Sequence, residues 1–129
     1  ADSRNALAFI FAVTGDSLDR AEALAEEALE LAPDLSAYWY DTLGWVRFRR
    51  GKHEEALEVL RIAESSLPPD DPSTKAENLY HIGAVLMALG RNEEAAEYLT
   101  KSVRRAKDEP WVPDLKARAR ELGIEEASI

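Results

Sequence analysis

Two stretches of this chain share one internal plan. Residues 40–68 read YDTLGWVRFRRGKHEEALEVLRIAESSLP, and residues 79–99 read LYHIGAVLMALGRNEEAAEYL. In each stretch a glycine precedes an alanine by twelve residues, and a leucine follows that alanine after four. The glycine and alanine pairs are Gly44 with Ala56, and Gly83 with Ala95. A fixed spacing inside a repeated unit is the sequence signature of a repeat protein.

A third copy is predicted upstream of these two. Ala21 lies 35 residues before Ala56, and Ala25 and Pro33 follow it at the same intervals as Leu60 and Pro68 follow Ala56. The first half of this copy is expected around Leu7, Ala8 and Phe11. The step from Ala56 to Ala95 is longer, at 39 residues, and we assign the additional residues to a loop at 69–73.

The apolar pattern predicts an all-α fold. Alanine and leucine recur every three or four residues through the second half of each copy, which is typical of an amphipathic helix. Gly51 and Gly90 are expected to end helices, whereas Asp71 and Pro72 are expected to begin one. We predict seven helices, at about residues 3–14, 18–32, 36–50, 53–67, 72–89, 92–107 and 113–122.

These motifs resemble the tetratricopeptide repeat family, and bacterial members in particular. The family unit is a helix-turn-helix of about 34 residues, so the resemblance implies a solenoid of three repeats in one domain spanning residues 1–129. The repeats would cover about residues 3–35, 36–70 and 72–107. The residues that match the family signature are Ala8, Ala21, Pro33, Leu43, Gly44, Ala56, Pro68, Gly83 and Ala95. The chain departs from the family at Ala8, where a glycine is usual, at Arg47, where an aromatic residue is usual, and at Lys107, where a proline is usual.

The two ends of the predicted solenoid differ. Residues 113–122 repeat nothing, and their apolar and basic sides suit a terminal capping helix. Residues 6–13 are apolar nearly all round and would need cover on both faces. We therefore expect an upstream repeat of a longer array, or a second copy of the chain, to cover the first helix.

The charge of the chain restricts its partners. The net charge is −9, which disfavours nucleic acids, and residues 1–36 hold eight acidic side chains against two basic ones. Residues 91–120 hold eight basic side chains against six acidic ones. No apolar run is long enough to span a bilayer, so membrane insertion is not expected and the chain is read as soluble. The sequence leaves its compartment, cytoplasmic or periplasmic, unknown.

The sequence offers no pattern for catalysis, a metal or another cofactor. Cysteine is absent, and His53 and His81 have no further ligands at metal-binding spacing. His53 is read as a turn residue, and His81 either as a packing residue or as a ligand contact. Asp70 and Asp71 are read as a turn and a helix cap. We expect a non-enzymatic protein.

The resemblance implies a concave groove lined by the first helix of each repeat, which would bind a protein or peptide segment. The expected partner-binding residues are Tyr38, Asp41, Trp45, Phe48, Arg49, Glu77, Tyr80 and Met87, with Asn5, Phe9, Ala12 and Ala84 also facing the groove. The alternative is that some of these side chains pack between neighbouring helices. The positions that clamp a carboxylate in chaperone-binding relatives hold Asn5, Phe9, Tyr38, Thr42 and His81, so a basic or apolar segment fits better than an acidic one.

A second hypothesis is architectural. The apolar first helix could dock on another copy of the chain, and the acidic end could meet a basic one. This would make the protein a homo-oligomer whose main partner is itself.

Overall fold

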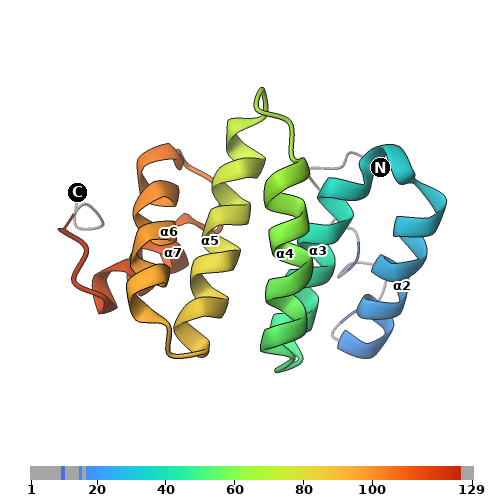
Figure 1. The fold of residues 1–129 in the computed structure, drawn as a ribbon, viewed down its shortest axis with the longest axis horizontal. Helices are drawn as coiled ribbons and strands as arrows, with labels where there is room; N and C mark the ends of the chain where they lie inside the picture. Colours follow the sequence, from blue (N-terminus) through green and yellow to red (C-terminus); the bar gives the residue numbers. More distant parts are fainter. Residues whose placement is uncertain (1–9, 11–14, 16, 126–129) are drawn as a thin grey trace. The chain divides into compact units, whose positions relative to one another are not determined.

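The computed structural model describes residues 10, 15 and 17–125, and this part of the chain is helical without strands. Its elements follow in the order α2 (Leu18–Leu31), the short 3-10 helix η2 (Pro33–Leu35), α3 (Ser36–Arg49), α4 (His53–Ser66), α5 (Pro72–Ala88), α6 (Asn92–Arg105) and α7 (Val112–Glu121) (Figure 1). The all-α prediction is confirmed, and each of the six α-helices here ends within two residues of its predicted bounds. The helix predicted at residues 3–14 lies outside the described residues, Ile10 excepted.

Glycine turns join α3 to α4 and α5 to α6. Gly51 has φ of 82° and Gly90 has φ of 77°, a left-handed conformation that side chains with a Cβ rarely adopt. The N–H of Lys52 donates to the carbonyl of Arg47 at 2.9 Å, and the N–H of Arg91 donates to the carbonyl of Leu86 at 2.9 Å. This is the Schellman pattern, which satisfies the last carbonyls of a helix, and it fixes where each first helix stops.

The start of α5 is capped by Asp71, as the sequence predicts. Its carboxylate accepts hydrogen bonds from the Thr74 N–H at 3.3 Å and from the Thr74 hydroxyl at 2.9 Å. Pro72 occupies the first turn, where its missing N–H leaves no bond unmade. These residues separate α5 from the loop that precedes it.

The chain divides into two compact units, residues 1–67 and residues 68–129. The first holds α2, α3 and α4, and the second holds α5, α6 and α7. The division falls close to the predicted end of the second repeat. A single domain of three repeats therefore stays a prediction.

The core of the first unit lies along one side of α3. Trp39, Leu43 and Val46 of this helix are buried against α2 and α4. Their partners in the buried cluster are Ile10, Ala21, Ala25 and Val59. Since Ala21 and Leu43 are signature positions of the repeat pattern, the register predicted from the sequence agrees with the buried positions of this unit.

Small residues allow the paired helices to pack closely. A Cβ placed on Gly44 would lie 2.5 Å from Cδ2 of Leu60 and 3.2 Å from the Ala56 carbonyl oxygen. In the second unit, a Cβ on Gly83 would lie 2.5 Å from Cδ2 of Leu99. The repeated glycine of each unit therefore lies where its two paired helices cross.

The second unit is closed by α7. This helix packs against α6 and buries Val112, Leu115 and Ala119. The other helix contact of this unit, between α5 and α6, includes a buried hydrogen bond, which the Ser102 hydroxyl donates to the Ala76 carbonyl at 2.7 Å. The apolar side of the segment predicted as a capping helix therefore faces the interior of this unit.

Candidate protein-binding site

Four of the expected partner-binding residues form a stripe along α3. Tyr38, Asp41, Trp45 and Phe48 are spaced by three, four and three residues, which places them on one side of a helix. This side differs from the one that carries Trp39, Leu43 and Val46 into the core. The stripe is therefore available for a role other than packing the buried cluster of the first unit.

Aromatic rings are in contact along this stripe. The centroids of Trp45 and Phe48 are 5.0 Å apart, and the ring of His53 lies 5.3 Å from that of Phe48. His53 begins α4, so the row of rings crosses from α3 to the start of the next helix. Tilted ring pairs at these distances attract one another through their quadrupoles, which holds Trp45 and Phe48 in a defined arrangement.

The stripe is partly open to solvent. Tyr38, Trp45 and Phe48 are half-buried, and Arg49 is exposed at the end of α3. Asp41 is different, because only 7% of its surface is exposed. The aromatic residues therefore present contact surface to a partner, whereas Asp41 presents little.

Tyr80 of α5 requires a correction. The sequence suggests an open groove residue, but Tyr80 is only 3% exposed. Its ring stacks on Trp111 with centroids 5.4 Å apart and planes 11° apart, and its hydroxyl donates a hydrogen bond to Asp114 of α7. Burial and the neighbouring Asp114 carboxylate raise the pKa of the Tyr80 hydroxyl well above its ordinary value. Tyr80 is thus a contact between helices of its own unit.

Asp114, which accepts the hydrogen bond from Tyr80, also pairs with Arg118 on α7. Burial opposes ionisation of Asp114, but its bonds to the Arg118 guanidinium, at 2.7 Å, and to the Tyr80 hydroxyl prevail and lower its pKa. Sequence reasoning missed Trp111 and Asp114, because the segment containing α7 repeats nothing and so has no internal register. The only available signal was its amphipathic pattern.

The other expected residues of α5 have mixed surroundings. His81 is buried, with its Nε2 atom 3.6 Å from a carboxylate oxygen of Glu77. Of the two readings of His81 that the sequence allowed, its burial favours the packing one. Ala84 is fully buried, whereas Glu77 and Met87 are half-buried.

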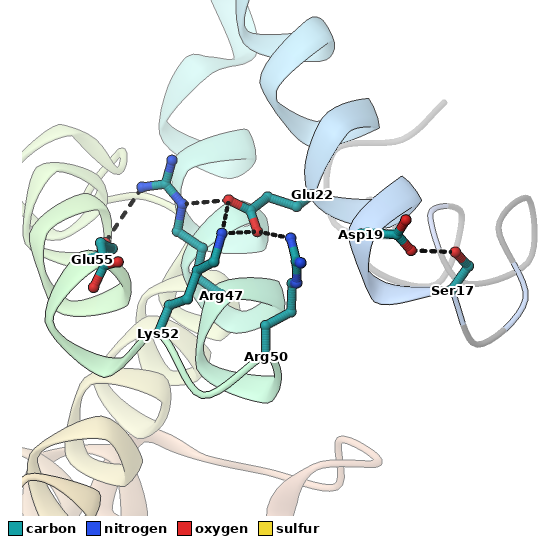
Figure 2. A network of polar contacts seen from close by, with 7 residues as sticks. All are labelled: Ser17, Asp19, Glu22, Arg47, Arg50, Lys52 and Glu55. Atoms are coloured by element: carbon teal, nitrogen blue, oxygen red, sulfur yellow. Dashed lines mark hydrogen bonds and ion pairs between the residues drawn. The ribbon is translucent and has the colours of Figure 1, made fainter.

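A buried carboxylate on α2 explains the departure at Arg47. Glu22 accepts bonds from Arg47 Nε at 3.2 Å, Arg50 Nη1 at 2.7 Å and Lys52 Nζ at 3.1 Å (Figure 2). The Glu22 side chain is only 8% exposed. Burial alone would raise its pKa, but the bonds from Lys52, Arg50 and Arg47 outweigh burial and lower it. The aromatic residue usual at position 47 is replaced by a cation that ties α2 to α3, while Arg50 and Lys52 tie α2 to the turn between α3 and α4.

The described part of the chain shows neither a metal-binding cluster nor a helix that could span a membrane. Within residues 17–125 and at positions 10 and 15, no group of three His, Cys, Asp or Glu side chains is arranged to hold a metal ion. In the same part of the chain, no helix combines the length and apolarity needed to cross a membrane.

The comparisons with known proteins agree with this geometry. Residues 76–109 match the family model of the tetratricopeptide repeat, which covers most of α5, the Gly90 turn and α6. A comparison with curated proteins finds no matching relative. Tetratricopeptide repeats generally mediate protein–protein interactions, and the family is typically a non-enzymatic scaffold. Residues 76–109 are therefore a tetratricopeptide repeat, with α5 and α6 as the helix pair that carries the match.

Proposed function

We propose that this protein holds a basic or apolar segment of a partner protein against the aromatic side of α3. The observation that carries the proposal is the pair formed by Trp45 and Phe48, whose rings are 5.0 Å apart and half-buried outside the core cluster. Tryptophan and other aromatic residues provide a large share of the energy in protein interfaces. The pair would serve as the anchor of the bound segment.

The chemistry of the segment follows from the ring faces and the charge around them. A lysine or arginine over a tryptophan ring is attracted by its negative face, by about 0.5–2 kcal/mol depending on exposure. The overall charge of −9 would draw a basic segment toward the protein. Arg49, exposed beyond Phe48, would contact a carbonyl or acidic group of the same segment and so help to fix its register.

Members of the second unit remain candidates for the same function. Glu77 would add a carboxylate for a basic residue, and Met87 would add a flexible apolar contact. Both are half-buried on α5. Tyr80 and Asp41 are given supporting roles only, because their side chains are nearly covered.

The experiment begins with a library of displayed peptides selected on the immobilised 129-residue chain. We expect the selected peptides to be enriched in Arg, Lys and apolar residues, and a representative peptide is then titrated against variants. Trp45→Ala should weaken binding by about tenfold or more, since truncating an interface hot spot costs about 2 kcal/mol or more.

Tyr98→Ala is the matched control. Tyr98 is also a half-buried aromatic residue, but it lies on α6 beside Lys101. Binding should be unchanged by Tyr98→Ala, and both variants should keep the helical circular-dichroism signal. Equal peptide affinity for Trp45→Ala and the wild type would refute the α3 site, and unfolding of Trp45→Ala would assign Trp45 to the core.

A further inference from the structure

An exposed leucine ends α2. Leu31 is 75% exposed, the highest value for any large hydrophobic residue in the described part of the chain. The repeat spacing of 35 and then 39 residues places Ser66 and Arg105 at the equivalent positions of the other copies, and both are exposed. This position therefore faces solvent in each copy, yet only here does it carry a large apolar side chain.

Carboxylates surround this leucine. Glu27 lies one turn before Leu31, Glu30 directly precedes it, and Asp34 follows three residues later, and all three are exposed. The last turn of α2 contains no basic residue. A helix C-terminus carries a partial negative charge that cations normally offset, so this end of α2 is an apolar knob within a strongly negative surface.

The second unit contains a pocket of the opposite charge. It lies between the end of α6 and α7, has a volume of about 290 Å³, and combines an apolar lining with basic side chains. The lining residues are Val103, Ala106, Val112 and Leu115, with Arg104, Lys107 and Lys116. No carboxylate lines it.

The nearby acidic side chains do not change this charge balance. Asp108 and Glu109 follow Lys107 but do not line the pocket. The Glu109 carboxylate accepts bonds from the Ser73 hydroxyl at 3.0 Å and from the Lys107 N–H at 2.8 Å. It is thus directed toward its own loop and the start of α5.

The size of the pocket restricts its occupant. Sites for small molecules commonly enclose about 300–1,000 Å³, and this pocket is at the lower end of that range. It suits one or two apolar side chains of a protein segment better than a whole cofactor. Its basic residues require that segment to be acidic.

We propose that Leu31 of one copy inserts into the pocket between α6 and α7 of a second copy. Glu27, Glu30 and Asp34 would then face Arg104, Lys107 and Lys116 of the acceptor. An apolar knob and a complementary pocket on one chain can pair reciprocally in a closed two-fold dimer, or head to tail in a ring or a filament. A second copy is favoured over another protein because both halves of the contact, with matching size and opposite charge, lie on the same chain.

This contact is independent of the aromatic side of α3, since none of its residues belongs to that stripe. It buries one leucine and a rim of exposed charges, so the association is expected to be weak and to depend on salt. Sedimentation velocity of the 129-residue chain should show a sedimentation coefficient that rises with concentration and falls when salt is added.

Variants of the leucine and of the pocket distinguish this contact from any other contact between copies. Leu31→Ser introduces the residue found at the equivalent position 66, and Lys107→Glu with Lys116→Glu reverses the charge of the pocket. Each change should weaken self-association by about tenfold or more. Ile62→Ser is the control, because Ile62 is the other exposed large hydrophobic residue in the described part of the chain, at 38%, and belongs neither to α2 nor to the pocket lining; it should associate like the wild type.

Mixing the variants gives the decisive result. The Leu31→Ser chain keeps its pocket, and the charge-reversed chain keeps its leucine, so a mixture should form dimers that do not grow further. Circular dichroism confirms that each variant is folded. Wild-type association by Leu31→Ser, or a mixture without dimers, would overturn the proposal. A wild type that stays monomeric at all concentrations would also overturn it and leave the pocket to an acidic segment of another protein.

Discussion

Substitution of Gly44 by alanine tests the helix crossing on which the first unit depends. The new Cβ would lie 2.5 Å from Leu60 Cδ2, and Leu60 is fully buried, so its side chain cannot turn out into solvent to make room. The Ala56 carbonyl oxygen at 3.2 Å blocks an easy shift of the helix itself. We expect net destabilisation even though alanine is the better helix former.

The magnitude follows from two opposing effects. Replacing glycine by alanine inside a helix stabilises by about 0.5–1 kcal/mol. Overpacking a filled core costs about 1–3 kcal/mol. The difference spans about 0–2.5 kcal/mol, and we expect Gly44→Ala to lower the free energy of unfolding by about 1 kcal/mol. Gly44→Leu should cost more, because its branch would have to occupy the space that Leu60 fills.

The assay is urea unfolding followed by circular dichroism, arranged as a double-mutant cycle. Leu60→Ala alone should cost about 2–5 kcal/mol through the cavity it leaves. Combined with Gly44→Ala it should cost less than the sum, because the new methyl group enters that cavity. If Gly44→Ala instead stabilises the protein by the full gain in helix propensity, Leu60 must move without cost. The close helix crossing would then not require a glycine at position 44.

Two further predictions concern titrating groups. Glu22→Gln should destabilise by about 1–3 kcal/mol near neutral pH, because a carboxylate with three cationic donors becomes a neutral amide. The pKa of Glu22 is lowered by folding, so its contribution is complete above the ordinary glutamate value and is lost as pH falls through the lowered one; melting curves from pH 7 to pH 3 should therefore converge for the wild type and Glu22→Gln, and a constant gap would contradict this. The pKa of Tyr80 is raised by folding, so stability should fall as pH rises above about 10, where tyrosine ionises in the unfolded chain. Tyr80→Phe should flatten that alkaline loss in urea titrations, and an unchanged slope would show that another group causes it.

The helices were predictable because the repeat pattern carries its own register. Gly44 and Gly83 stand twelve residues before Ala56 and Ala95, and only small residues fit where the helices cross. Caps such as Asp71 then set the ends. Spacing and turn chemistry are local properties of the sequence, which is why the bounds came within two residues.

The candidate site was less predictable than the helices. The spacing of residues along a helix shows which of them share a side, but it does not show which element packs against that side. Trp45 and Tyr80 both stand on the expected side of a first helix, yet Trp45 is half-buried and Tyr80 is covered by α7. Nothing in the repeat indicates that Trp111 stacks on Tyr80, since α7 is not part of the repeated unit. The pairing of Glu22 with Arg47 spans 25 residues and has no sequence signature of its own.

The carboxylates at the two ends of α2 have different roles. Substitutions at the start of α2 should therefore change the stability of the fold, and substitutions at its end should change self-association. Near its start, Glu22 has three cationic partners and is nearly buried, so its ion pairs stabilise the fold of a single chain. Near its end, Glu27 and Glu30 are exposed beside Leu31 with no cation in the last turn. Glu22→Gln should therefore lower the melting temperature without changing self-association at temperatures where the chain is folded. Leu31→Ser should do the reverse, because an exposed leucine adds little to the fold but much to a contact that buries it.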